Sequence, residues 1–245
     1  MTDLIILLPL IFLAALLFSS VGHGGATAYL AVFTLVAVEP TAMRPAALCL
    51  NVLVASIALY KFTKIRAFNW PLFWPIALFS VPFAYIGGQM TLPNQIYKML
   101  VGFCLIFAAW SIYSYANKPE ITAIKPVKKP ILMALGAGLG LLAGLTGVGG
   151  GIFLSPILLT FNWAKTKVVS GVAAAFILAN SLSGLLGMLS KSPQLPNGLG
   201  YWAIAAIMGG YIGAEYGSKR LNNKTIRYIL ALVLLFAGSR MVFFG

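Results

Sequence analysis

Charged side chains are scarce in this sequence of 245 residues, and acidic ones are almost absent. Only 9% of the residues are charged, with 4 Asp and Glu against 17 Lys and Arg. A soluble domain carries about 25% charged residues, so this composition excludes an ordinary soluble globular protein. The hydrophobic content of 60% also excludes a disordered chain, which requires low hydrophobicity. The sequence therefore predicts an all-α polytopic membrane protein.

Residues that commonly carry catalysis are also few. The chain has one histidine and two cysteines, and each cysteine lies inside an apolar run. There is no HExxH, GxSxG or P-loop motif, and one histidine cannot supply the ligands of a zinc site. No polar stretch is longer than the one at 117–129, which leaves no room for a soluble catalytic or ATP-hydrolysing domain. We therefore predict no enzyme activity, no cofactor and no metal, and the lack of paired membrane carboxylates argues against transport of sodium or metal cations.

The apolar residues fall into ten runs separated by short polar segments. A helix needs about 20 apolar residues to span a bilayer, and several runs reach that length. The runs at 26–38 and 152–163 are too short to span, and each follows a cluster of glycines. The ten runs lie at 4–20, 26–38, 43–60, 70–90, 94–116, 130–146, 152–163, 170–190, 198–216 and 225–244.

The two halves of the chain resemble each other. The glycine cluster at 22–25 aligns with the one at 147–150 at an offset of 125, and residues 85–88 (Tyr-Ile-Gly-Gly) align with 211–214 (Tyr-Ile-Gly-Ala) at an offset of 126. Matches in the same order and at similar offsets are typical of a duplicated unit. The predicted units are a first repeat at 1–116, a polar linker at 117–129 and a second repeat at 130–245.

The basic residues decide how the repeats are related, because Lys and Arg concentrate on the cytoplasmic side of membrane proteins. If each glycine cluster lies within one broken spanning helix, the repeats are parallel and the basic residues split 9 to 8 between the two sides. If each cluster turns a hairpin, the repeats are inverted and the split is 13 to 4. The second arrangement obeys the rule, places both termini outside and the linker in the cytoplasm, and explains the basic charge without nucleic acid. Its inside residues are Lys61, Lys64, Arg66, Lys118, Lys125, Lys128, Lys129, Lys165, Lys167, Lys219, Arg220, Lys224 and Arg227, and its outside residues are Arg44, Lys98, Lys191 and Arg240.

The two glycine clusters are the strongest candidate for a binding site. A backbone break at membrane depth frees N–H and C=O groups, which are tolerated only where they face protein or a water-filled cavity. The short runs after the breaks would begin with unpaired N–H groups and the positive end of a helix dipole. Two such starts can build an anion site in a secondary transporter, although the same glycines could serve only close helix packing. The backbone candidates are Gly22, Gly24, Gly25, Gly147, Gly149, Gly150 and Gly151.

Four side chains near the breaks could complete such a site. His23 lies inside the first break and can carry a proton or donate to an anion near neutral pH, while the second break has Val148 in its place. Asn51 and Asn180 lie at similar places in the two halves. Their buried amides could donate to an oxyanion or bridge two helices. Thr146 adds a hydroxyl beside the second break.

Two charged residues at the edges of apolar runs each have two interpretations. Glu215 precedes Lys219 by four residues, which favours a helical ion pair, but with His23 it is also a candidate for proton coupling. Arg44 opens the third run, where it could attract anions to an outer vestibule. We expect instead that Arg44 extends to the membrane interface.

Other glycines recur at every fourth position within an apolar run. This spacing lets two membrane helices pack closely. We therefore predict helix packing, rather than ligand binding, for two stripes, which are Gly136, Gly140 and Gly144, and Gly209, Gly213 and Gly217.

With these features the sequence resembles the TauE/SafE family of sulfite and organosulfonate exporters. The resemblance rests on the chain length, the two-fold repeat and the glycine-rich breaks, most clearly on residues 144–151 (Gly-Leu-Thr-Gly-Val-Gly-Gly-Gly) and the following 152–156. The matching first-half stretch is 20–25, and His23 and the adjacent Ala26 depart there from the usual pattern. The resemblance implies export of small sulfur-containing anions, such as sulfite or sulfonates, driven by the proton gradient.

We therefore expect a secondary transporter of the bacterial cytoplasmic (inner) membrane. It would have two inverted repeats of five helical segments, each opened by a glycine-broken hairpin. Its partners would be a small sulfur-containing anion, protons and the lipid bilayer. The alternatives are a passive anion channel on the same scaffold and a membrane assembly factor that transports nothing. Accumulation of the anion under a proton gradient distinguishes a transporter from a channel, and anion binding distinguishes both from an assembly factor.

Overall fold

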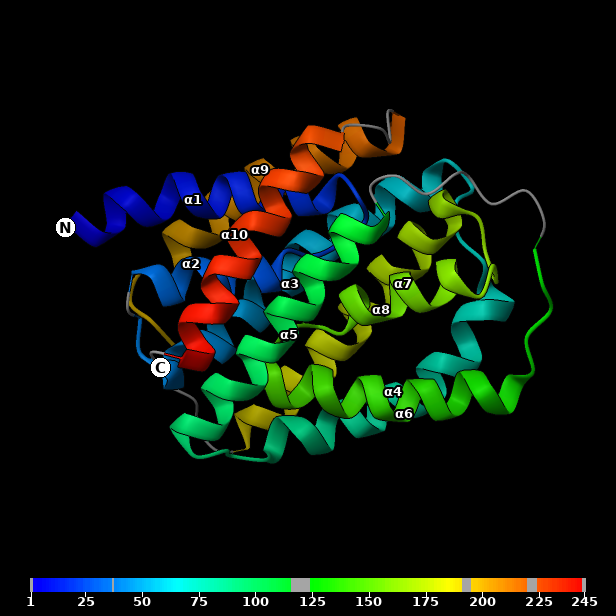
Figure 1. Ribbon diagram of the computed structural model, residues 1–245, viewed down its shortest axis with the longest axis horizontal. Coiled ribbons are helices and arrows are strands. Elements are labelled where there is room, and N and C mark those ends of the chain that lie inside the picture. Colours follow the sequence, from blue (N-terminus) through cyan, green and yellow to red (C-terminus); the bar gives the residue numbers. More distant parts are fainter. Residues whose placement is uncertain (1, 37, 116–123, 191–194, 220–223, 244–245) are drawn as a thin grey trace.

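The computed structural model describes residues 2–36, 38–115, 124–190, 195–219 and 224–243 (Figure 1). These residues form ten helices and no strand, which confirms the predicted all-helical fold, and each predicted apolar run corresponds to one helix. In chain order the helices are α1 (Thr2–Ser19), α2 (Ala26–Leu35), α3 (Pro40–Lys64), α4 (Trp70–Gln89), α5 (Asn94–Tyr115), α6 (Lys129–Thr146), α7 (Gly151–Thr160), α8 (Thr166–Leu189), α9 (Leu199–Lys219) and α10 (Lys224–Phe243).

The helices differ in their capacity to cross a membrane. Within the described part of the chain, five are long and apolar enough to span, namely α3, α4, α5, α6 and α8. The helices that follow the glycine clusters, α2 and α7, have 10 residues each. Such a helix is about 15 Å long, roughly half the thickness of the hydrocarbon core of a bilayer. Helices α2 and α7 are therefore too short to span.

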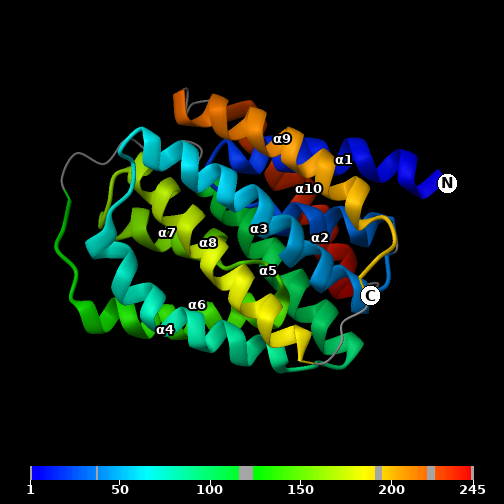
Figure 2. The ribbon, with the colours of Figure 1, turned by 180° about the vertical axis from the view of Figure 1, so that it is seen from behind.

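Helices α3 and α8 form the centre of the bundle. In each of them 61% of the apolar span is buried inside the protein, against 39% in α4 and in α6. The two central helices contact each other, and α9 packs on α3 while α4 packs on α8. The outer pairs are α1 with α9, α4 with α6, and α5 with α10 (Figures 1 and 2).

The two predicted glycine stripes lie in two of these outer contacts. The stripe in α6 faces the main chain of α4, and the stripe in α9 faces the main chain of α1. Each glycine lets a carbonyl oxygen of the neighbouring helix occupy the space of a missing side chain, so the two backbones approach closely. This confirms the predicted packing role. The carbonyls that the glycines face belong to Ile76, Ser80 and Ala84 in α4, to Phe12 and Leu16 in α1, and to Ser20 directly after α1.

The two ends of the bundle differ in the segments that they contain. Both termini and the α2–α3 connection lie at one end, whereas residues 124–128 and the α3–α4 and α7–α8 connections lie at the other (Figures 1 and 2). The Lys125 N–H donates to the Asn162 carbonyl at 2.8 Å, which joins residues 124–128 to the α7–α8 connection. Lys61, Lys64 and Lys165 all lie at this second end. Three residues of the predicted charge distribution, Lys118, Lys191 and Arg220, and linker residues 117–123 lie outside the described residues.

The stripe in α6 contains a matched pair for a stability test. A Cβ at Gly140 would overlap the main-chain oxygen of Ser80, whereas a Cβ at Gly138 in the same helix would have no atom within 4 Å. We expect Gly140→Ala to destabilise the protein by about 1–3 kcal/mol, because α4 and α6 must move apart. Gly138→Ala should be neutral or stabilising, since alanine favours a helix by about 1 kcal/mol over glycine. Thermal unfolding of both variants in detergent tests this, and equal melting temperatures would contradict it.

Candidate functional site

The first break connects α1 to α2 through residues 20–25. The Gly22 N–H donates to the Ser19 carbonyl at 3.0 Å, and the His23 N–H donates to the Phe18 carbonyl at 2.9 Å. Gly22 and Gly25 have φ angles of +79° and +93°, in the left-handed region that favours glycine. The chain therefore leaves α1 and enters α2 through two positions where a side chain would be strained.

The second break connects α6 to α7 and, like the first, contains glycines with positive φ angles. Gly147, Gly149 and Gly150 have φ angles of +77°, +77° and +75°. The Thr146 hydroxyl accepts a hydrogen bond from the Val148 N–H at 3.2 Å and donates to the carbonyl one turn earlier in α6. Thr146 thus uses its hydroxyl to shape the turn.

The two breaks meet at Asn51 of the central helix α3. The Asn51 Oδ1 accepts from the N–H of Ala26, the first residue of α2, at 2.9 Å. On the other side its Nδ2 donates to the Ser181 hydroxyl at 3.2 Å and to the Val148 carbonyl at 3.5 Å. A Cβ at Gly24 would overlap the Asn51 amide. The fully buried Asn51 amide therefore joins one break to the other and to α8.

The first turns of α2 and α7 are the positive ends of two helix dipoles. Their N-cap residues are Gly25 and Gly150, which provide no side-chain cap. Asn51 binds the Ala26 N–H, but the N–H groups of Gly151 and Ile152 find no hydrogen-bond acceptor in the described part of the chain. Free N–H groups at a helix start are suited to bind an anion.

His23 links the first break to the helix that follows the second. Its Nε2 lies 3.2 Å from the hydroxyl oxygen of Ser155 in α7, and its Nδ1 lies 3.2 Å from the Val21 carbonyl. The imidazole is half-buried. A titratable ring therefore lies in the same region as the two breaks.

Asn180 makes its hydrogen bond within α8 and not to either break. Its Nδ2 donates to the Phe176 carbonyl at 2.7 Å, and its buried Oδ1 has no partner among the described residues. Helices α3 and α8 begin at Pro40 and Thr166, an offset of 126, so the counterpart of Asn51 is Ile177. Ile177 is the α8 side chain that a Cβ at Gly24 or Gly149 would contact.

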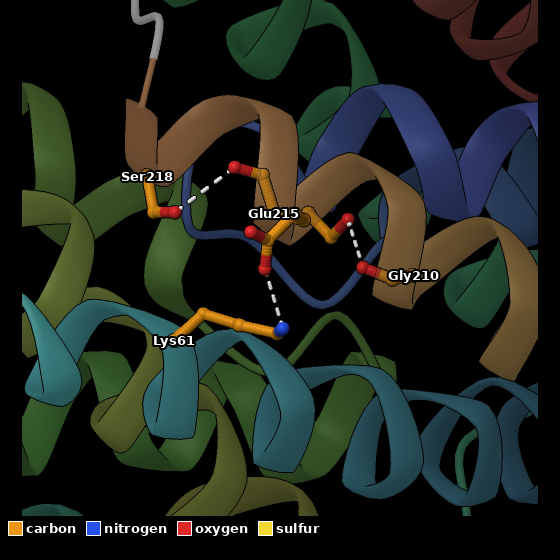
Figure 3. A network of polar contacts seen from close by, with 5 residues as sticks. Lys61, Gly210, Glu215 and Ser218 are labelled. Carbon is orange, nitrogen blue, oxygen red and sulfur yellow. Dashed lines mark hydrogen bonds and ion pairs between the residues drawn. The ribbon is translucent and has the colours of Figure 1, made fainter.

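Glu215 lies away from the breaks, in contact with α3. Its carboxylate forms an ion pair with Lys61 (Figure 3). The Lys61 Nζ also lies 4.0 Å from the centre of the Tyr211 ring. Lys61 is ten residues beyond Asn51 in α3, about 15 Å along the helix. The sequence predicted a pair with Lys219, whose side chain lies outside the described residues. Of the two proton-coupling candidates, the structure thus brings only His23 to the breaks.

Arg44 does not extend to the membrane interface as expected, because its side chain is buried between helix ends. The guanidinium donates four hydrogen bonds of 2.6–3.0 Å to main-chain carbonyls. Carbonyls at a helix C-terminus lack intrahelical partners and carry partial negative charge, so they stabilise a cation there. The side chain also contacts Gly147, so it joins α4 to the second break. The four acceptors are Gly144 in α6 and Gly87, Gly88 and Met90 at the end of α4.

Two further polar side chains lie at the breaks, and the sequence analysis did not identify either of them as a binding candidate. The Ser181 hydroxyl accepts from Asn51, and the buried Tyr97 hydroxyl of α5 donates to the Thr146 carbonyl at 3.2 Å. The sequence signal that could have identified them is that each is a polar residue inside an apolar run. No group of three or more His, Cys, Asp or Glu side chains that could hold a metal ion occurs among the described residues.

The chain is similar to known membrane transporters along its length. The sequence profile of the family described as sulfite exporter TauE/SafE matches residues 7–241. The probable membrane transporter protein y4hK of Sinorhizobium fredii is 34% identical over 234 residues, which cover 94% of this chain and 95% of that protein. The probable membrane transporter protein MJ0441 of Methanocaldococcus jannaschii is 26% identical, covering 76% of this chain and 73% of that protein. No solved structure matches the chain.

The matched region contains both glycine breaks and Asn51, at which they meet. It also extends over parts of all ten helices. The apolar spans and the transporter relatives together identify an integral membrane protein. The chain belongs to the sulfite exporter TauE/SafE family of membrane transporters.

Proposed function

We propose that this protein is a secondary transporter that moves a small sulfur-containing anion, sulfite or an organosulfonate, by alternating access. The observation that carries the proposal is the convergence of the two glycine breaks on Asn51, beside the first turns of α2 and α7. The anion would bind between the breaks, at Gly22, His23, Gly24, Gly25, Asn51, Thr146, Gly147, Gly149, Gly150, Gly151 and Asn180. In this region the proposed donors are the N–H groups at the start of α7 and the imidazole of His23.

The helix contacts support two inverted repeats. If α1–α5 correspond in order to α6–α10, each helix contact in the structure should have an equivalent. The α1–α9 contact is equivalent to the α6–α4 contact, and the α3–α9 contact is equivalent to the α8–α4 contact. The α3–α8 and α5–α10 contacts are each equivalent to themselves. All these contacts occur in the structure. Residues 124–128 lie at the end of the bundle opposite both termini. Each half of the chain therefore begins and ends at opposite ends of the bundle, which fits an odd number of membrane crossings in each half. Each repeat would then open with a glycine-broken hairpin, α1–α2 or α6–α7.

The charge around the second break favours an anion over a cation. The buried Arg44 side chain lies beside Gly147, its four acceptors are carbonyls, and no carboxylate among the described residues forms an ion pair with it. Its positive charge adds to the positive ends of the helix dipoles. Among the described side chains, Glu215 is paired with Lys61 away from the breaks and no cluster of acidic groups that could hold a metal cation occurs.

Proton coupling is proposed through His23, with Glu215 as the second candidate. His23 contacts Ser155 of α7, so its protonation would alter both the charge and the hydrogen bonds between the breaks. Glu215 would act at a distance, through its ion pair with Lys61 between α9 and α3. An ion gradient is the proposed source of energy.

Anion binding and flux test the proposal directly. A panel of sulfite, sulfate, thiosulfate, sulfoacetate, taurine, chloride and acetate is compared at matched ionic strength and pH in detergent. We expect one sulfur-containing anion to raise the melting temperature selectively, because a ligand that binds the folded state stabilises it by mass action. In proteoliposomes that anion should accumulate under a proton gradient. Flux without accumulation would indicate a channel, and a flat response to every anion would favour a non-transporting role.

A negative charge at Asn51 should abolish anion binding while the fold is kept. Asn51→Asp retains the oxygen that accepts from the Ala26 N–H, and the Ser181 hydroxyl can reorient to donate to the second carboxylate oxygen. The hydrogen bond to the Val148 carbonyl is lost, so the melting temperature without anion is compared with that of the wild type to check the fold. Asn69→Asp is the matched control, because the Asn69 Oδ1 also accepts a helical N–H, from Leu72 at 3.0 Å, in an exposed place. We expect anion-induced stabilisation to be lost in the first variant and kept in the second. Wild-type anion binding by Asn51→Asp would move the site elsewhere.

The orientation is tested by chemical labelling of single cysteines. Cys49 and Cys104 are replaced by alanine, and a cysteine is introduced at Glu39 or at Lys125, both exposed. With both termini outside the cytoplasmic membrane, a membrane-impermeant maleimide should label position 39 in intact cells. Position 125 should be labelled only after permeabilisation, because the basic end lies inside. The opposite pattern would reverse the proposed orientation, and labelling of both positions in intact cells would exclude an odd number of crossings per repeat.

A further inference from the structure

Tyr29 of α2 carries a hydroxyl that the fold leaves unused. The side chain is completely buried, and its hydroxyl oxygen has no hydrogen-bond partner among the described residues. A buried polar group without a partner lowers stability, so its presence calls for an explanation. Phenylalanine would fill the same space without this cost.

The unused hydroxyl lies at the first break. Side chains of a helix lean toward its N-terminus, and Tyr29 lies one turn after Gly25, the N-cap of α2. A Cβ at Gly25 would be 2.8 Å from both the Cζ and the hydroxyl oxygen of Tyr29. The Tyr29 N–H donates to the Gly25 carbonyl at 2.9 Å. The phenol therefore folds back over the start of its own helix, where the dipole favours negative charge.

The phenol belongs to one break only. At the offset of 125 that aligns the glycine clusters, Leu154 takes the place of Tyr29 in α7, as Val148 takes the place of His23. The first break therefore presents two side-chain groups, an imidazole and a phenol, that the second break lacks. This difference indicates a role in ligand contact rather than in the turn itself, because the second break forms without either side chain.

We propose that the Tyr29 hydroxyl is a specificity-determining donor, which binds an oxygen atom of the anion held at the N-terminus of α2. This inference rests on the proposed function and adds a residue to the same site. In the structure without an anion, the hydroxyl has no partner among the described residues. When the anion enters, its oxygen supplies the missing acceptor, and the buried O–H directs binding toward oxyanions.

The test compares Tyr29→Phe with the wild type. Affinity is measured by titration with sulfite, sulfoacetate and chloride in detergent, together with the melting temperature without anion. We expect an affinity for the oxyanion that is at least about tenfold weaker, the effect of losing one hydrogen bond to a charged group. Chloride binding should change less. The melting temperature without anion should not fall, because the removed hydroxyl has no partner in the described part of the chain.

Ser80→Ala provides the matched control. The Ser80 hydroxyl is also buried without a partner among the described residues, but Ser80 lies where α4 packs on Gly140 of α6. We expect this variant to keep wild-type affinity for the anion. An equal loss of affinity in both variants would show a general effect of removing a buried hydroxyl and would overturn the inference.

The remaining outcomes separate this inference from the proposed function. If the wild type binds a sulfur-containing anion and Tyr29→Phe binds it equally well, the inference is wrong and the proposed function stands. If no anion of the panel binds the wild type, both are wrong.

If Tyr29→Phe does not fold, meta-fluorotyrosine at position 29 is used, since its phenol is a stronger donor. Tighter oxyanion binding would support the inference, and unchanged binding would overturn it.

Discussion

The hydrogen bonds of the Asn51 amide hold the centre of the protein together. One side-chain amide accepts from the start of α2 and donates to the second break and to α8. The geometry works only because Gly24 and Gly149 lack side chains, since a Cβ at either position would overlap the amide. The amide thus satisfies backbone groups that a membrane interior would otherwise leave unpaired. This amide links both breaks to the two central helices, α3 and α8.

The centre and the periphery of the bundle are stabilised in different ways. Glycine stripes bring the backbones of α4 and α6, and of α1 and α9, into direct contact. Between the centre and the periphery, Gly187 of α8 lies against the Tyr85 carbonyl of α4. At an offset of 126, Lys61 of α3 and Tyr211 of α9 take their places, and Lys61 contacts the Tyr211 ring and pairs with Glu215 one turn further along α9. One of these related contacts is therefore close backbone packing, and the other is an ion pair with a partly exposed carboxylate. The α3–α9 contact is the one that depends on charge.

The sequence was sufficient to predict the ten helices and both packing stripes, because apolar runs and fourfold glycine spacing are local signals. It did not predict the place of Arg44, since a basic residue near the start of an apolar run normally extends to water, and the carbonyls that bind it belong to other helices. The pair of Lys61 with Glu215 joins residues 154 positions apart, so it depends on how α9 packs on α3. Asn51 and Asn180 lie at similar places in the sequence, but they are not equivalent positions. When α3 and α8 are aligned at their first residues, Asn180 lies three residues, nearly one helical turn, beyond the position equivalent to Asn51.

The unequal breaks also bear on how such a protein can be assembled. His23, Tyr29, Arg44 and Asn51 all come from the first half, and at offsets of 125 or 126 the second half has Val148, Leu154, Ser170 and Ile177. A homodimer of the first half would contain two Arg44 cations and two Asn51 amides, while the Ser181 hydroxyl that accepts from Asn51 would be missing. Two copies of the second half would lack the amide bridge altogether. The two halves are complementary, so covalent fusion in one polypeptide ensures that each first half meets a second half and never a copy of itself.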